Sequence, residues 1–248
     1  MVMMDDIVVN VQNASVCFNK ASGNISGLKE YVIKLLKREL MFQEFFALKD
    51  INFQVKRGES WGLIGTNGSG KSTLLKLISG IIEPYTGSVE INGSISPLIE
   101  LGAGFDSELT ARENIFLNGA LLGYSKNFME EHFKKIVDFA EVNDFLDVPI
   151  KNFSSGMSAR LGFAIATATK PNILIVDEVL AVGDYAFQQK CKARMEELLS
   201  GGTTLLFVSH SIEQVKTLCQ YAVWIDKGIV REQGNVQSVS QKYMSSFN

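Results

Sequence analysis

Short apolar runs bounded by turn residues recur along the chain and predict β-strands. The first alternates in hydrophobicity from Ile7 to Phe18, and Val9, Val11 and Val16 are its expected inward positions. Further strands are predicted at residues 51–55, 60–65, 88–92, 172–177, 203–209 and 222–226. A glycine turn and another short run follow the last of these, which indicates a hairpin. Since several runs are almost continuously apolar and helical stretches separate them, we expect an α/β protein with a buried parallel sheet.

Helical spacing of apolar residues predicts helices in two other stretches. No strand-like run interrupts the chain from about Phe105 to Gly162, where Phe133 and Ile136 lie on one helix face. The tail, residues 235–248, predicts a short polar helix.

Residues 28–40, LKEYVIKLLKREL, form a separate amphipathic pattern. Leu28, Tyr31, Val32 and Leu35 fall at helical intervals, and lysines flank this apolar stripe. Such a helix suits a membrane interface or a membrane-embedded partner, because its apolar residues can be buried while the lysines stay in the polar layer. A helix that packs on its own domain would give the same pattern.

Composition narrows the classes of protein without identifying one. The 248 residues are 46% apolar and 21% charged, as in ordinary globular proteins. The net charge of −3 gives no basic footprint, so we expect no nucleic-acid partner. No apolar run approaches the roughly 18–20 residues that span a bilayer, and the acidic N-terminus lacks a signal-peptide pattern. Cys17, Cys191 and Cys219 are widely spaced, so we expect reduced thiols in a cytosolic chain.

Residues 65–72, GTNGSGKS, match the phosphate-loop pattern G-x-x-x-x-G-K-[ST] between a predicted strand and a helical run. The glycines let the backbone curl so that successive N–H groups face phosphate oxygens. Lys71 supplies a positive charge to the β- and γ-phosphates, and the Ser72 hydroxyl is placed to bind Mg²⁺. The expected nucleotide-binding residues here are Gly65, Thr66, Asn67, Gly68, Ser69, Gly70, Lys71, Ser72 and Thr73.

A second element is the run ILIVDE at 173–178. Its apolar residues place Asp177 at the carboxyl end of a buried strand, at the sheet edge where the phosphate loop lies. Asp177 would hold Mg²⁺, and Glu178 would polarise the attacking water in line with the γ-phosphate. Such a pattern is weak alone and strong beside a phosphate loop, so we predict hydrolysis with Glu178 as a catalytic residue.

His210 follows a further apolar strand, and a parallel sheet would bring it to the same edge. Taken alone, such a histidine is more often a hydrogen-bonded structural residue. Beside the other two motifs, we predict that His210 contacts the γ-phosphate and acts as a second catalytic residue. His132, in contrast, is expected at a solvated helix position.

The stretch NFSSGMSAR, residues 152–160, offers a second anion site far from the first. Its turn, Ser154-Ser155-Gly156, opens directly onto a helical run. The backbone N–H groups and the two hydroxyls therefore lie at a helix N-terminus, where the peptide dipoles favour an anion.

The order of these motifs resembles that of the nucleotide-binding domain of ABC transporters, over nearly the whole chain. The resemblance implies the ABC ATPase fold, a P-loop NTPase (RecA-like) α/β core with an N-terminal antiparallel β subdomain and an inserted helical subdomain. It implies a single domain over 1–248, with a helical subdomain at 105–162 and the remainder at 1–104 and 163–248. It also implies ATP and Mg²⁺ as cofactors.

In that family the signature LSGGQ contacts ATP held by a second chain. FSSGM, residues 153–157, stands in its place here, so Ser154 and Gly156 match while Ser155 and Met157 depart. The resemblance implies that Ser154, Ser155 and Gly156 bind ATP in trans, across a head-to-tail homodimer.

Three further residues take their expected roles from the resemblance. Asp184, in AVGD at 181–184, should face the opposite subunit at the dimer interface. Phe18 stands where an aromatic side chain stacks on adenine. Glu100, in PLIELGAGF at 97–105, is nearest to the place of a glutamine that binds the metal, so it is a candidate Mg²⁺ ligand.

Several stretches, among them 28–40, 100–119, 154–167 and 177–191, look like the branch that exports lipid-linked polysaccharides such as O-antigen, capsule or teichoic acid. This implies a separate polytopic permease, in two copies, and a peripheral location on the cytoplasmic face of the inner membrane. It also favours contact of 28–40 with the membrane or the permease. The alternatives are a soluble ABC-type ATPase that acts on nucleic acid or ribosomes, and a nucleotide-gated regulator without turnover.

Overall fold

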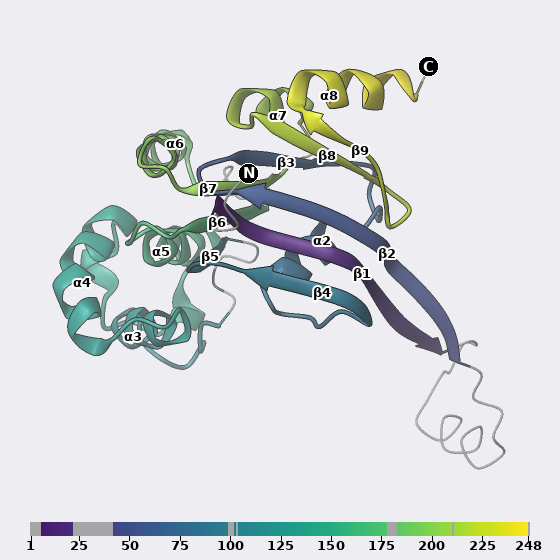
Figure 1. Cartoon of the computed structure of the whole chain (residues 1–248). Helices are drawn as coiled ribbons and strands as arrows, with labels where there is room; N and C mark the ends of the chain where they lie inside the picture. The colour runs from purple at the N-terminus through teal and green to yellow at the C-terminus, as the bar shows by residue number, and fades with distance from the viewer. Residues whose placement is uncertain are drawn as a thin grey trace, which may run out of the picture.

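The computed structural model describes residues 6–21, 42–98, 102, 104–177, 183–209 and 211–247, and contains two sheets (Figure 1). A three-stranded antiparallel sheet has the order β2 (Phe42–Lys56), β1 (Ile7–Ala21) and β4 (Thr86–Ile91). A six-stranded sheet has the order β5 (Ile95–Leu98), β6 (Ile173–Asp177), β7 (Thr204–Val208), β3 (Ser60–Ile64), β8 (Tyr221–Asp226) and β9 (Ile229–Asn235). Its neighbours are parallel except for the antiparallel hairpin of β8 and β9.

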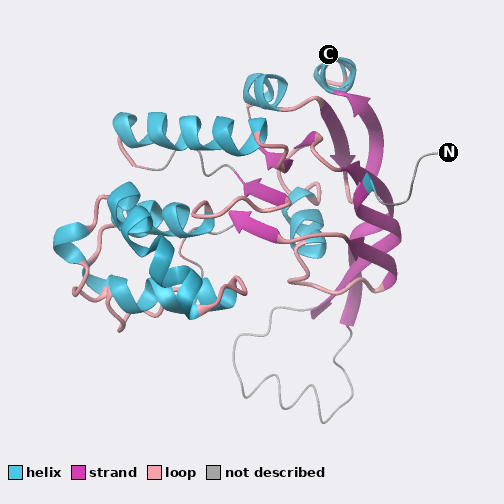
Figure 2. Ribbon diagram, turned by 60° about the vertical axis from the view of Figure 1, so that its left-hand side comes forward, coloured by secondary structure: helices cyan, strands magenta, loops and turns pink. Residues whose placement is uncertain are grey.

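Seven α-helices are described. They are α2 (Lys71–Ile78), α3 (Ala111–Leu121), α4 (Lys126–Ala140), α5 (Ser155–Ala166), α6 (Tyr185–Ser200), α7 (Ile212–Leu218) and α8 (Val236–Ser245). Two short 3₁₀ helices, η2 (Asn143–Phe145) and η3 (Ile150–Asn152), precede α5. In the view of Figure 2, most of the helices lie on one side of the molecule and the long paired strands on the other. None of the described helices is long and apolar enough to span a membrane.

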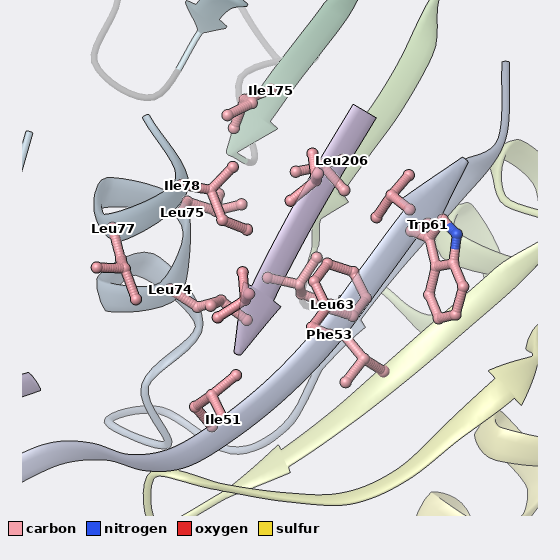
Figure 3. Close-up of a cluster of buried hydrophobic side chains, with 14 of the residues drawn as sticks. Ile51, Phe53, Trp61, Leu63, Leu74, Leu75, Leu77, Ile78, Ile175 and Leu206 are labelled. Carbon is pink, nitrogen blue, oxygen red and sulfur yellow. The ribbon is translucent and has the colours of Figure 1, made fainter. Parts of the chain in front are cut away.

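Burial explains why the central strands form. Every residue of β3 and β7 is buried, as expected for a parallel sheet covered on both faces. Apolar residues of α2 pack into this core, and Figure 3 shows Leu74, Leu75 and Ile78 facing side chains from the strands. The packing fixes α2 against the sheet, and so fixes the loop that leads from β3 into it.

The helices α3, α4 and α5 form a separate group beside the sheets (Figure 1). They share their own apolar core, which includes Ile115 of α3, Val137 of α4 and Leu161 of α5. The prediction that this part of the chain is helical is confirmed. The division of the chain into subdomains at the stated boundaries stays a prediction.

The strand predictions are confirmed, except that β2 is longer than predicted and β5 was not predicted. β1 and β2 both run for 15 residues, so β2 begins well before the predicted run at 51–55. β5 was not predicted, because it has four residues and contains Ser96 and Pro97. Proline is tolerated there since β5 is an edge strand. Ser96 is buried and donates to the carbonyl oxygen of Ala166 at 2.8 Å, which links β5 to α5.

The structure also shows the surroundings of His132 and of two of the cysteines. His132 lies on α4, as expected, and is partly exposed, while its ring also stacks on Phe128 with the ring centroids 4.0 Å apart. Cys191 and Cys219 are buried free thiols, and burial raises the pKa of each to about 12. The predicted tail helix is confirmed as α8.

Candidate functional site

The phosphate loop lies at the carboxyl edge of the parallel sheet. It connects the end of β3, at Ile64, to the start of α2, at Lys71. Strand β7 lies between β3 and β6, and its residue Val208 pairs with both Leu63 and Asp177. The strand order therefore brings Asp177 and the loop, which are far apart in sequence, to the same edge.

Two glycines of the loop occupy positions where a side chain would not fit. Gly65 has a φ of 150°, and a Cβ there would lie 2.2 Å from the carbonyl oxygen of Ile225. Gly70 has a φ of 113°, and a Cβ there would lie 2.8 Å from Cδ2 of Leu48 and 3.0 Å from the carbonyl oxygen of Ala47. The loop backbone thus packs directly against β2 and the end of β8, which holds its curled shape.

Lys71 lies under the loop, and only 6% of it is exposed. Its Nζ donates to the carbonyl oxygens of Gly65, at 2.8 Å, and Thr66, at 2.9 Å. Ser69 is 2% exposed, and its Oγ has no hydrogen-bond partner among the residues that the structure describes. The Lys71 ammonium suits the oxygens of a phosphate group, which accept hydrogen bonds from it.

Ser72 and Asp177 meet at the end of this loop. The Ser72 hydroxyl donates to Oδ2 of Asp177 at 3.4 Å, although the two residues are 105 positions apart in the sequence. Hydroxyl and carboxylate oxygens are the ligands that Mg²⁺ prefers. The pair therefore fits a magnesium ion.

A pocket of about 490 Å³ extends from this loop. It is lined by residues of the loop and of the first turn of α2, and by Asp177 and Val208 at the strand ends. Phe18 from β1 and Phe45 and Ala47 from β2 also line it. The structure thus places Phe18 in the same pocket as the phosphate loop, as expected of a residue that contacts a base.

Three of the predicted site residues lie outside the described part of the chain. They are Glu178, His210 and Glu100. Asp177, which precedes Glu178, and Val208, two positions before His210, pair with each other in the sheet. The roles of these three residues stay predictions, as does the helix at 28–40.

The serine-glycine turn is a helix cap. Ser154 is the N-cap of α5, and its Oγ accepts a hydrogen bond from the backbone N–H of Met157 at 3.2 Å. Ser155 begins the helix, and both serines are exposed. A Cβ on Gly156 would meet one atom within 4 Å, the Ser154 hydroxyl at 3.9 Å, so this side of the turn is open. The turn therefore presents an ordered helix N-terminus outward.

Arg160, six residues after Ser154, joins this helix to two others. Its guanidinium donates to Oε2 of Glu141 at 2.9 Å and to Oδ2 of Asp184 at 2.8 Å, and lies 4.9 Å from the ring centroid of Phe187. Asp184 also caps α6 by accepting from the N–H of Phe187 at 2.9 Å. That hydrogen bond, helped by the charge of Arg160, lowers the pKa of Asp184.

A second pocket, of about 470 Å³, lies where the turn meets the start of α6. Ser154, Gly156, Arg160 and Asp184 are among its lining residues. Within the described chain, it shares no lining residue with the pocket of the phosphate loop. The predicted roles of the turn and of Asp184 toward a second chain stay predictions.

Sequence reasoning gave no role to Phe45 or Arg160, which line these pockets. Phe45 belongs to an aromatic pair, Phe45-Phe46, four residues ahead of the predicted strand at 51–55, and that pair was its available signal. Arg160 is a lone basic residue on an otherwise small and apolar helix face. Its partners lie 19 and 24 positions away in the sequence, which no periodicity reveals.

Comparison with known proteins identifies the family. Residues 48–181 match the family model described as ABC transporter. An O-antigen export system ATP-binding protein of Klebsiella pneumoniae is 44% identical over 224 residues, which cover 90% of this chain and 91% of that protein. A teichoic acids export ATP-binding protein of Listeria monocytogenes is 43% identical over 91% of this chain, and an ABC transporter protein of Aeromonas salmonicida is 50% identical over 80% of it. The matched region spans 65% of each of these last two proteins.

Solved structures agree on the fold. An ATP-binding subunit of an ABC transporter has a TM-score of 0.73 at 23% identity, and the match covers 95% of this chain and 93% of that one. A dimeric ATP-binding cassette bound to ADP and phosphate has a TM-score of 0.72 at 21% identity, covering 92% and 98%. The predicted ABC ATPase fold is confirmed. The chain belongs to the ABC transporter family and is an ABC-type ATPase.

Proposed function

We propose that this chain is the ATP-hydrolysing subunit that powers export of a lipid-linked polysaccharide, of the O-antigen, capsule or teichoic acid type, through a separate membrane permease. The observation that carries the proposal is the 44% identity to an O-antigen export ATP-binding protein, which this chain matches over 91% of its length. The relative named for teichoic acid export supports the same class of cargo. Both favour export over the alternative of an ATPase that acts on nucleic acid or ribosomes.

In this proposal the first pocket binds Mg²⁺ and ATP. The loop N–H groups and the Lys71 ammonium bind the phosphates, and Ser72 and Asp177 hold Mg²⁺, with Glu100 as a further candidate ligand. The ion would neutralise charge on the β- and γ-phosphate oxygens. Glu178 accepts a proton from the attacking water, and His210 contacts the γ-phosphate and keeps that water in line.

The second pocket serves another molecule of the same chain. Ser154, Ser155 and Gly156 would approach the γ-phosphate of ATP bound to a second copy, so that two ATP molecules lie in the interface of a head-to-tail homodimer. The exposed and ordered N-terminus of α5 supports this, since such a terminus favours an anion. Asp184 would lie at the same interface.

The remaining parts of the proposal concern the membrane. The permease would be polytopic and present in two copies, and this chain would bind it peripherally, at the cytoplasmic face of the inner membrane. Residues 28–40 would contact the permease or the lipid surface through their apolar stripe.

A gene deletion in the source organism tests the function. Loss of this chain should deplete the surface polysaccharide and leave its lipid-linked form inside the cell. Wild-type protein should restore export, whereas Lys71→Ala and Glu178→Gln should not. Glu178→Gln should still bind ATP, which separates failed turnover from failed binding. Normal surface polysaccharide in the deletion strain, or sedimentation of the protein with ribosomes instead of membranes, would refute the proposal.

A further inference from the structure

Two exposed aromatic residues lie side by side on the neighbouring strands that line the pocket of the phosphate loop. Phe18 of β1 and Phe45 of β2 are direct partners in the antiparallel ladder, so their side chains project from the same face of the sheet. Phe18 is 45% exposed and Phe45 is 55% exposed, and both line the pocket of the phosphate loop. Figure 1 shows β1 and β2 side by side along their whole length.

The next residue on β2 is a natural contrast. Phe46 pairs with Cys17 instead, and its side chain is on the other face of the strand. There it makes an edge-on contact with Tyr85, with ring centroids 6.0 Å apart. Phe46 thus has an aromatic neighbour away from the pocket, whereas Phe45 presents its ring to the pocket.

The position of Phe45 relative to the phosphate loop is fixed by the backbone. The N–H of Lys49, on β2, donates to the carbonyl oxygen of Gly228 at 2.8 Å, and the N–H of Gly228 donates to the carbonyl oxygen of Ser69 at 2.8 Å. Leu48 also packs directly against Gly70. Phe45 lies three residues before Leu48, on the order of 10 Å along the strand. It is therefore held at a set distance from the loop, in the same pocket.

We propose that Phe45 is a second base-binding residue, which forms with Phe18 a two-ring wall for the purine of the bound nucleotide. The inference rests on the proposed ATP binding and adds a residue and a mode of recognition to it. Stacking on aromatic rings contributes about 1–3 kcal/mol per base in nucleic-acid complexes, and it is tolerant of base identity because every base has a π-face. The wall formed by Phe18, Phe45 and Ala47 has no polar side chain to read the base edge. The affinity for a nucleotide should therefore increase with the size of its base, so a purine nucleotide should bind more tightly than a pyrimidine nucleotide.

Equilibrium binding to the full-length chain tests this, with Mg-ATP, Mg-CTP and inorganic tripolyphosphate as the probes. Phe45→Ala should weaken ATP binding roughly 5- to 100-fold. Binding of tripolyphosphate, which has no base, should not change. Wild-type protein should bind ATP more tightly than CTP, and Phe45→Ala should narrow that difference. Phe45→Trp should keep the wild-type affinity, because it retains a large ring.

Phe46→Ala is the matched control, since it removes the same side chain one position along the strand and should leave ATP affinity unchanged. Phe45→Leu keeps most of the apolar volume and serves if the alanine variant fails to fold; it too should lose ATP affinity. Unchanged ATP affinity in a folded Phe45 variant would overturn the inference, as would an equal loss for ATP and tripolyphosphate. Wild-type protein that binds no ATP would refute the proposed function itself, and this inference with it.

Discussion

The phosphate loop and the serine-glycine turn both present backbone N–H groups at a helix N-terminus, but their surroundings differ. Lys71 and Ser69 of the loop are buried, and the loop backbone packs against β2 and the end of β8. Ser154 and Ser155 are exposed, and their helix packs on α3 and α4 through Leu161 and on the sheet and α6 through Phe163. The backbone of the first site is braced by its own chain, although Thr66, Asn67 and Gly68 are exposed, and the second site is ordered but has no such bracing at Gly156.

The difference suggests how the two sites divide their roles. A loop whose backbone is packed in this way can bind a phosphate without further ordering, since its conformation is already set. The open turn already has its cap, through Ser154, and it lines a pocket separate from the one at the phosphate loop. We infer that binding depends on the first site and turnover on the second.

Removing the charge from the phosphate loop should have the largest effect. Lys71→Ala should weaken Mg-ATP binding by about 10²- to 10⁴-fold, since a hydrogen bond to a charged group contributes about 1.5–3 kcal/mol and at least two phosphate contacts are lost. Calorimetric titration of the purified chain measures this directly. ATP affinity within tenfold of wild type would show that the loop binds phosphate without its lysine.

Blocking the open site should affect turnover and leave binding intact. Ser154→Arg adds bulk and charge at the N-terminus of α5, so a second copy should no longer close on it. Turnover should fall by about 10²- to 10³-fold, as when a positioned donor to the transition state is lost. ATP affinity should stay at the wild-type value.

The dependence of activity on enzyme concentration independently tests whether turnover requires a second chain. Wild-type activity per molecule should rise with protein concentration, because an isolated chain would dimerise weakly. Activity per molecule that is constant in a proven monomer would mean that both half-sites act within one chain.

The smallest effect is expected for Asp184, whose carboxylate pairs with Arg160 of α5 and caps α6. Asp184→Asn keeps a capping side chain but removes the charge that pairs with Arg160, so the melting temperature at pH 7 should fall by about 2 °C. The pKa of Asp184 is lowered from its ordinary value of 3.8, so its stabilisation is present above that value. It is lost as the pH falls through the lower pKa of the folded chain. The gap between the two melting curves should therefore close in acid, and a gap that is constant with pH would contradict this.

Local patterns in the sequence predicted the elements that depend on local chemistry. The apolar runs predicted β3, β6 and β7 because these strands are buried on both faces, and the glycine pattern predicted the phosphate loop. Asp177 was placed correctly because parallel strands end at a common edge. β5 was missed since an edge strand of four residues needs little hydrophobicity.

Contacts between side chains from distant elements could not be predicted in the same way. The position of Phe45 opposite Phe18 depends on the register of two strands, which includes irregularities between Val11 and Cys17. The contact of Arg160 with Glu141 depends on how α5 packs against the end of α4. Neither the strand register nor the helix packing can be predicted from the periodicity of the sequence.

The central place of β3 also has a consequence for synthesis on the ribosome. β3 lies between β7 and β8, yet both of these neighbours are made more than a hundred residues later. At about 5–20 residues per second, the apolar segment 60–64 emerges roughly ten to thirty seconds before it can pair. During this interval it is a target for misassembly and for chaperones. The nucleotide site therefore forms near the end of translation, and an incomplete nascent chain should not bind ATP.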